Sequence, residues 1–516
     1  MNLFRAIAAI GSVTMVSRVF GFIRDILIAA VLGASTSADC FFVAFRLPNL
    51  FRRLFAEGAF SAAFVPIFAG LLETDGRDKA KEFADQAFSV LVLALIVFTA
   101  LFELAMPLVM YGLAPGFDEV PGKMELATEL SRITFPYLLF ISLVSLQSGV
   151  LNSLGRFSAA AATPVLLNLT LITAILTLPA FLETPGHALA WGVAAAGLFQ
   201  LAWLALHCRR EGLPVRLVRP RLSPKVRLLG RRIVPVVFGA SLYQINLLIG
   251  TILASLLSEG AVSYLYYADR VTQLPLGVVG IAVGTALLPM LSRQIKAGDG
   301  PGALHSQNRG LEFALLLTLP AAVALMVIAE PIISVLFERG RFDAADSLAT
   351  AHALAAFSVG LPAYVLIRVL APGFFAREDT VTPVRIAAVA MVANVVLNVI
   401  LMQVWAHVGI ALASSVAAWI NAGLLWIILR RRGFLVLDAR VAARLPRILL
   451  AACLMAGVLA GGQYLLDGLL GGATHERIAA LALLVTTGLA AFGGFARLTG
   501  AFAFSDIRAL RRDGSA

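Results

Sequence analysis

Long apolar segments separated by short polar breaks run through the whole chain and predict a bundle of transmembrane helices. A helix needs roughly 20 mostly apolar residues to cross a bilayer, and the segments have about this length. They lack the alternating ten-residue pattern of an outer-membrane barrel, so helices are the expected spanning structure. Counting them predicts fourteen spans, centred near residues 20, 55, 100, 140, 168, 197, 243, 278, 323, 362, 393, 418, 456 and 488.

The composition agrees with a polytopic membrane protein. Of the 516 residues, 60% are hydrophobic and only 14% are charged, whereas soluble proteins carry about 25% charged residues. This balance excludes a soluble enzyme. Cys40, Cys208 and Cys453 are scattered and form neither a disulfide framework nor a metal-binding spacing. Arginines interrupt the N-terminal segment and it lacks a cleavage site, so we expect it to stay as the first span.

The distribution of basic residues predicts the orientation of the chain. With the N-terminus inside, 29 of the 41 lysines and arginines fall in cytoplasmic segments and five fall in outside loops, namely Lys123, Arg132, Arg339, Arg341 and Arg477. Short cytoplasmic loops accumulate these residues, so we expect an even number of spans and both termini in the cytoplasm. The net charge of +11 comes from these loops. It is accompanied by no nucleic-acid-binding signature, and no nucleic-acid partner is expected.

An internal repeat divides the first twelve predicted spans into two sets of six and leaves the last two spans without a counterpart. Residues 57–68 align with residues 280–291 at an offset of 223, and further weak matches follow in the same order. An even number of spans per copy predicts a parallel repeat about the membrane normal, which is typical of transporters. We predict four regions: an N-lobe at 1–208, a basic cytoplasmic linker at 209–225, a C-lobe at 226–432, and two extra helices with a basic tail at 433–516.

Seven arginines lie inside the predicted spans. A charged side chain at the bilayer centre costs about 2.5 to 3.5 kcal/mol and usually faces an interior cavity. Arginine binds two phosphate oxygens at once through its planar donors. The excess of arginines over carboxylates therefore predicts an anionic ligand such as a pyrophosphate. The seven are Arg18, Arg24, Arg46, Arg52, Arg53, Arg270 and Arg368.

Helical spacing gives a partial geometry for the second span. It places Arg46, Asn49, Arg53 and Glu57 on one face, with Arg52 pointing elsewhere. Pro48 can break this helix and change the register. Which of Arg52 and Arg53 faces the cavity is therefore left open.

Purely structural roles compete with ligand binding at several positions. Glu57 lies four residues after Arg53 and can neutralise it. Asp39, at the start of the second span, can be a helix cap. A buried pair between Asp269 and Arg270 is a structural alternative for the second lobe.

Known cofactor-binding motifs are missing from the sequence. It has no GxxxxGK[ST] phosphate loop and no HExxH pair, and its six histidines show no metal-ligand spacing. We expect no cofactor and no metal. The energy source is then the membrane potential, a monovalent ion gradient or the gradient of the substrate.

Two segments carry a family resemblance. Residues 18–68 and 261–291 closely resemble the MurJ (MviN) family of lipid II flippases, within the multidrug/oligosaccharidyl-lipid/polysaccharide exporter superfamily. The resemblance implies an all-α protein of fourteen transmembrane helices, with two six-helix lobes around a central cavity and two extra helices. It implies translocation of undecaprenyl-pyrophosphate-linked peptidoglycan precursor from the cytoplasmic to the periplasmic leaflet of the bacterial inner membrane by alternating access.

The resemblance also implies site residues and partners. The expected partners are lipid II, membrane lipids and proteins of cell-wall synthesis. The residues implied to bind substrate are Arg18, Arg24, Arg52 and Arg270, and those implied to support the cavity or its gating are Asp25, Asp39, Asn49, Arg53 and Glu57.

Other functions predict different features. A flippase of another polyprenyl-pyrophosphate-linked oligosaccharide would share the arginine chemistry and differ in the motifs. An ion-coupled exporter of cationic drugs would need an acidic cavity. An intramembrane enzyme would need a catalytic acid, histidine or metal cluster, and a non-transporting scaffold would leave the buried arginines unexplained.

Overall fold

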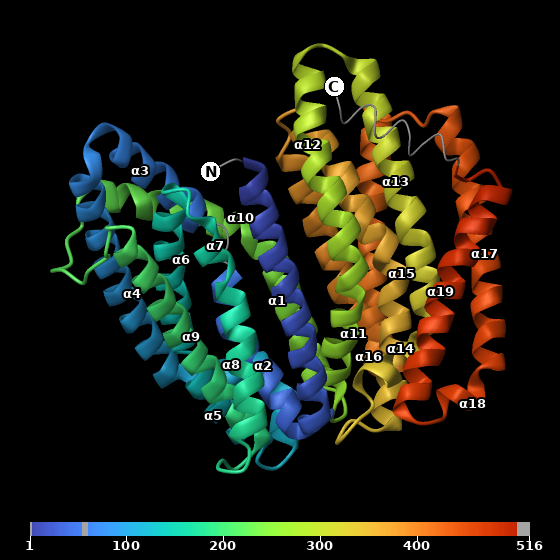
Figure 1. Ribbon diagram of the computed structural model, residues 1–516, viewed down its shortest axis with the longest axis horizontal. Helices are drawn as coiled ribbons and strands as arrows, with labels where there is room; N and C mark the ends of the chain where they lie inside the picture. The colour runs from blue at the N-terminus through green and yellow to red at the C-terminus, as the bar shows by residue number, and fades with distance from the viewer. Residues whose placement is uncertain (1–2, 54–59, 503–516) are drawn as a thin grey trace. The chain divides into compact units, whose positions relative to one another are not determined.

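The chain folds into two compact helical units (Figure 1). The computed structural model describes residues 3–53 and 60–502. Unit 1 holds the chain up to Ser263 together with residues 339–342, and unit 2 holds residues 264–338 and the chain from Asp343 onward. Among the described residues, the one β-type feature is an isolated bridge between Arg339 and Phe342. The predicted all-α fold is confirmed.

Unit 1 contains the helices from the N-terminus to the middle of the chain, coloured blue to green in Figure 1. They are α1 (Leu3–Leu32), α2 (Thr36–Phe51), α3 (Phe60–Thr74), α4 (Gly76–Leu113), η2 (Pro115–Glu119), α5 (Lys123–Thr134), α6 (Tyr137–Ser153), α7 (Phe157–Ala161), α8 (Thr163–Thr177), α9 (Pro185–Arg210) and α10 (Pro224–Ser255).

Unit 2 contains the remaining helices, coloured green to red, although the first three residues of α11 belong to unit 1. They are α11 (Ala261–Pro275), η3 (Leu276–Gly280), α12 (Ile281–Lys296), α13 (Gly300–Val327), α14 (Ala329–Phe337), α15 (Ala344–Phe375), α16 (Val381–Arg431), α17 (Ala439–Leu465), α18 (Asp467–Leu470) and α19 (Thr474–Leu498).

Nine helical stretches within the described part of the chain are long and apolar enough to cross a membrane. The predicted span centres fall on helical segments, except the centre near residue 55, which lies outside the described residues. The protein is therefore a multi-pass membrane protein. The count of fourteen spans stays a prediction.

The 51-residue helix α16 is two helices joined at a kink. The backbone leaves helical geometry at Trp405 and Ala406, and Ala406 has a φ of +46°. At about 1.5 Å per residue, 51 straight helical residues would far exceed the thickness of a bilayer. The kink lies between the two span centres that the sequence predicts near residues 393 and 418.

Close helix packing in both units depends on small residues. In unit 1, a Cβ atom on Gly192 of α9 would come within 2.8 Å of Ala174 on α8. In unit 2, a Cβ on Gly360 of α15 would come within 2.7 Å of the Ser415 hydroxyl on α16. Small residues let helix backbones approach closely where lipid gives no hydrophobic driving force.

The two units do not follow the limits of the predicted lobes. Helix α10, which the repeat assigns to the second lobe, packs against α3, α4 and η2 and belongs to unit 1. The lobes at 1–208 and 226–432 are defined by the sequence repeat and stay a prediction.

Candidate functional site

Arg24 lies buried in the contact between α1 and α8. Its Nη2 and Nε donate to Asp25 Oδ1 at 2.7 and 3.1 Å, and its Nη1 donates to Asn168 Oδ1 at 2.8 Å. Asn168 in turn donates to the carbonyl of Ser17 at 2.9 Å. Arg24 is 5% exposed and Asp25 is 2% exposed. The predicted substrate residue Arg24 and the predicted supporting residue Asp25 thus form one buried ion pair.

This pair has an energetic consequence for both charges. Burying a lone charge is costly, and removing one partner of a buried pair typically destabilises a protein by about 3 to 5 kcal/mol. Asp25 compensates the positive charge of Arg24 inside the protein, and Asn168 fixes the plane of the guanidinium.

The arginines of α2 lie around the end of that helix. Pro48 is inside the last turns, α2 ends at Phe51, and Arg52 and Arg53 continue in π-helical geometry. The Nε and Nη2 atoms of Arg52 donate to Asn49 Oδ1 at 3.0 and 2.8 Å. A proline interrupts the regular helical hydrogen bonds, so extrapolation of a straight helix through residue 53 was unreliable.

Three other predicted residues have different settings. Arg46 is half-buried, and its Nε donates to the Thr251 hydroxyl of α10 at 3.0 Å. Arg18 is exposed and Arg53 is half-buried. Glu57, predicted to support the cavity, lies outside the described residues.

Asp39 is the centre of a second buried network in unit 1. Its Oδ2 accepts hydrogen bonds from Lys123 Nζ and the Gly260 amide, both at 2.9 Å. Its Oδ1 accepts from the Ser263 hydroxyl at 2.7 Å and the Ser263 amide at 3.1 Å. Asp39 is 1% exposed and Lys123 is 3% exposed. The carboxylate is therefore satisfied by one ammonium group and by the start of α11.

Asp39 does not cap its own helix, which was the structural alternative that the sequence left open. The N-cap of α2 is Ser35, whose hydroxyl accepts from the Ala38 amide at 3.4 Å. Asp39 instead binds amides at the start of α11, while Glu259 accepts from the amide and hydroxyl of Thr36 at the start of α2. Asp39 of α2 thus accepts hydrogen bonds from the start of α11, and Glu259 accepts them from the start of α2. The positive end of each helix dipole favours a negative charge at these positions.

Lys123 and Ser263 are functional candidates that the sequence did not reveal. Lys123 was counted among outside loop charges, yet it is buried and its Nζ lies 4.4 Å from the ring centre of Phe117. The position of Lys123 in a predicted loop gives no sign that its side chain is buried next to an aromatic ring and a carboxylate. Its partner Asp39 is 84 positions away in the sequence.

Arg270 lies on α11 in unit 2. Its Nε and Nη2 donate to the Tyr266 hydroxyl at 3.2 and 3.0 Å, and its Cζ is 5.1 Å from the centre of the same ring. Gln273 donates to Asp269 on the same helix. Arg270 is half-buried and Arg368 on α15 is exposed. Tyr266, one turn before Arg270, holds the guanidinium through its hydroxyl and its ring.

The structure thus pairs three predicted arginines with nearby acceptors: Arg24 with Asp25, Arg52 with Asn49, and Arg270 with Tyr266, which was not predicted. Each pair contains one arginine and a group that accepts a hydrogen bond. Phosphate oxygens are stronger acceptors for a guanidinium than a neutral hydroxyl or amide. The pairs at Arg52 and Arg270 can therefore exchange their protein acceptor for an anionic ligand.

Comparison with known proteins identifies the family. The sequence matches the family model described as lipid II flippase MurJ over residues 28–475. The chain belongs to the MurJ family. A relative from Rhizobium tropici named probable lipid II flippase MurJ is 44% identical, over 99% of this chain and 97% of the relative. The lipid II flippase MurJ of Burkholderia cenocepacia is 40% identical, over 84% of this chain and 85% of the relative.

Solved structures show the same fold as this MurJ family member. The structure titled lipid II flippase MurJ in an inward closed conformation aligns with a TM-score of 0.77 at 24% identity, covering 95% of this chain and 98% of that chain. An inward-facing multidrug resistance MATE transporter of the MOP superfamily aligns with a TM-score of 0.67 at 16% identity, covering 83% of this chain and 98% of that chain. The resemblance found in the sequence is confirmed.

Proposed function

We propose that this chain is a lipid II flippase, a transporter that moves the lipid-linked peptidoglycan precursor from the cytoplasmic to the periplasmic leaflet. Its membership of the MurJ family along residues 28–475 carries this conclusion. The relatives from Rhizobium and Burkholderia bear that function in their names. The protein acts in the inner membrane with both termini in the cytoplasm, as its loop charges predict.

The arginines provide the chemistry for the pyrophosphate. Arg24, Arg52 and Arg270 bind the diphosphate oxygens while the polyprenyl tail stays in lipid. Arg52 and Arg270 each make hydrogen bonds to neutral side chains, which a charged oxygen can replace. Arg24 has a carboxylate partner, so it holds the charged end of the site in a fixed position.

Alternating access requires that the arginines bind the diphosphate less tightly in the outward-facing state than in the inward-facing state. Asn49 and Tyr266 lie within hydrogen-bonding distance of the arginines and compete with the substrate for the same donors. Asp39 supports gating, because it ties α2 to the first residues of α11, the helix that carries Arg270. The membrane potential or a monovalent ion supplies the energy.

Depletion of the protein in its own host tests this function. We expect the lipid II that a periplasmic lipid II-cleaving toxin can reach to fall when the protein is lost. Wild type should restore it, whereas Arg24→Ala and Arg270→Ala should not. Arg293→Ala, at an exposed arginine near the end of α12, is the matched control and should restore it.

Each outcome of this experiment has a clear meaning. Unchanged accessibility after depletion, with no second flippase present, would contradict lipid II as the substrate. Full rescue by both Arg24→Ala and Arg270→Ala would agree with flippase function but would contradict the arginine site.

A further inference from the structure

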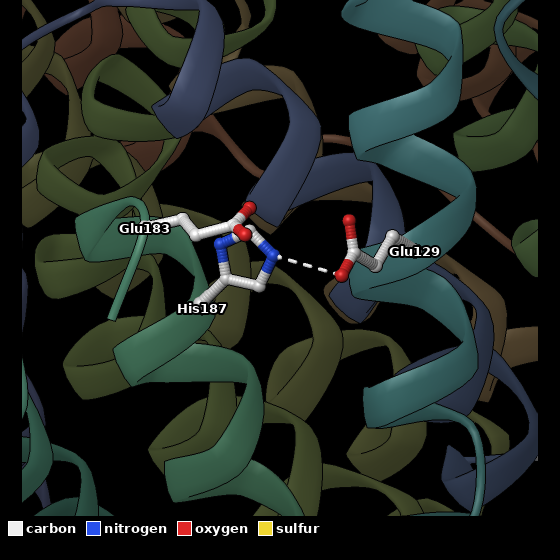
Figure 2. Close-up of side chains that lie close together, drawn as sticks. All are labelled: Glu129, Glu183 and His187. Atoms are coloured by element: carbon white, nitrogen blue, oxygen red, sulfur yellow. Dashed lines mark ion pairs between the residues drawn. The ribbon is translucent and has the colours of Figure 1, made fainter. Parts of the chain in front are cut away.

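A histidine and two glutamates from separate elements converge in unit 1 (Figure 2). Glu129 lies on α5, Glu183 precedes α9, and His187 lies in the first turn of α9. Their potential ligand atoms all lie within 4.8 Å of one another. Glu183 lies four residues before His187, but Glu129 lies on a different helix, so histidine spacing alone gave no sign of the cluster.

The imidazole is buried and oriented by the surrounding protein. His187 is 5% exposed, and its Nδ1 lies 2.9 Å from the Thr184 hydroxyl. Its Nε2 has no hydrogen-bond partner among the described residues, although it is shielded from solvent. When Nδ1 donates its proton to Thr184, Nε2 carries the free lone pair and points toward the glutamates (Figure 2). Ligating histidines are oriented through their second nitrogen in this way.

The distances suit a small tetrahedral ion. His187 Nε2 lies 3.4 Å from Glu129 Oε1. Two ligands at about 2.0 to 2.2 Å from a tetrahedral zinc ion are separated by about 3.4 Å. Glu129 and Glu183 are both exposed, so Glu183 can adjust its rotamer to complete the set and an ion can enter from solvent. The first turn of α9, which carries His187, is held beside α2 because the Gly186 amide donates a hydrogen bond to the Ser37 hydroxyl at 3.1 Å.

We propose that Glu129, Glu183 and His187 bind a divalent cation of the zinc class. One imidazole and two carboxylates are ligands that zinc accepts, and a fourth position stays open to water. Bound metal links α5 to the start of α9, next to the N-terminal turn of α2. The alternative is a His187–Glu129 ion pair without metal, which needs a protonated imidazole and does not use Glu183.

Zinc binding to the purified full-length protein tests this site. The protein is prepared without a histidine tag, treated with chelator, and dialysed against micromolar zinc, and bound metal is measured by mass spectrometry. We expect one zinc per chain and a higher melting temperature when zinc is added. His187→Gln, Glu129→Gln and Glu183→Gln should each weaken zinc binding at least tenfold.

Two controls make the result specific. Glu125→Gln changes an exposed acid in the first turn of α5, and His207→Gln changes the histidine near the other end of α9. Both should bind zinc like the wild type. Because Glu183 is exposed, Glu183→Gln keeps the test valid even if His187→Gln fails to fold. Absence of stoichiometric binding at tens of micromolar zinc, or equal binding by the cluster variants, would overturn the site and leave the ion pair.

Discussion

At the scale of single residues, Arg24 serves both stability and the proposed binding of pyrophosphate. Arg24→Ala should leave Asp25, which is 2% exposed, as an uncompensated buried charge. We expect a loss of about 3 to 5 kcal/mol, measured as a lower melting temperature of the purified protein. The double variant Arg24→Ala/Asp25→Ala should recover most of this loss without restoring lipid II accessibility. A double variant that transports would contradict a direct role for Arg24.

The same reasoning applies to the Asp39 network. Asp39→Asn should strand the buried Lys123 ammonium and lower stability by about 3 to 5 kcal/mol. Adding Lys123→Met removes the stranded charge and should restore much of the melting temperature. Glu125→Gln, two residues along α5 and exposed, should have no effect. If Asp39→Asn alone is as stable as wild type, the ion pair contributes no net stability.

At the scale of elements, a buried carboxylate fastens α17 to α13. Glu312 of α13 is 7% exposed and accepts from Arg309, Arg440 and Arg444, and Arg309 also pairs with Asp438 at the N-cap of α17. Such a network can fix the position of a helix that has few other polar contacts. Within unit 2, α17 is therefore held against α13 by charge as well as by apolar packing.

Glu312→Gln should loosen this attachment. Arg440 and Arg444 would lose their shared anion, and repulsion between them should expose the connection at 432–438 to protease. We expect cleavage there at least several-fold faster than in wild type, measured by limited proteolysis in detergent. Glu330→Gln, at an exposed acid on α14, should cleave like wild type. Equal protection of Glu312→Gln would show that apolar packing alone holds α17.

The turn between α15 and α16 should give a measurable pH dependence. Hydrogen bonds from the Thr382 hydroxyl and amide, and then from Arg432, lower the pKa of Asp379 from 3.8 to about 2. Because this pKa is lowered by folding, its stabilisation is complete above about pH 4 and is lost as the pH falls toward 2. The melting temperature of wild type should therefore fall more steeply over this range than that of Asp379→Asn. Asp78→Asn, at an exposed acid, should follow wild type.

At the scale of the whole molecule, the sequence predicted the features that depend on one segment at a time. The apolar runs predicted helices, and the arginines of the first two spans stood out because charge is rare in such runs. The motifs at 18–68 and 261–291 were sufficient to predict the family, which the match over residues 28–475 confirms. These signals are local and need no knowledge of tertiary contacts.

The features that the sequence did not predict depend on contacts between distant segments. Lys123 was counted as a loop charge, and neither the supporting role implied for Asp39 nor its alternative role as a helix cap indicated that the two residues pair. The six histidines showed no metal-ligand spacing, because the cluster around His187 includes Glu129 from a different helix. Pro48 and the π-helical turn after Phe51 made helical extrapolation unreliable at Arg52.

The most direct test of the proposed function is lipid transfer by the purified protein. Proteoliposomes would contain lipid II labelled with a fluorophore, and an impermeant quencher would report its arrival at the opposite leaflet. We predict transfer with wild type and with Arg293→Ala, little transfer with Arg270→Ala, and little transfer of a polyprenyl-pyrophosphate carrying an unrelated oligosaccharide. Equal transfer of both lipids would contradict lipid II specificity. Unimpaired transfer by Arg270→Ala would contradict the arginine site.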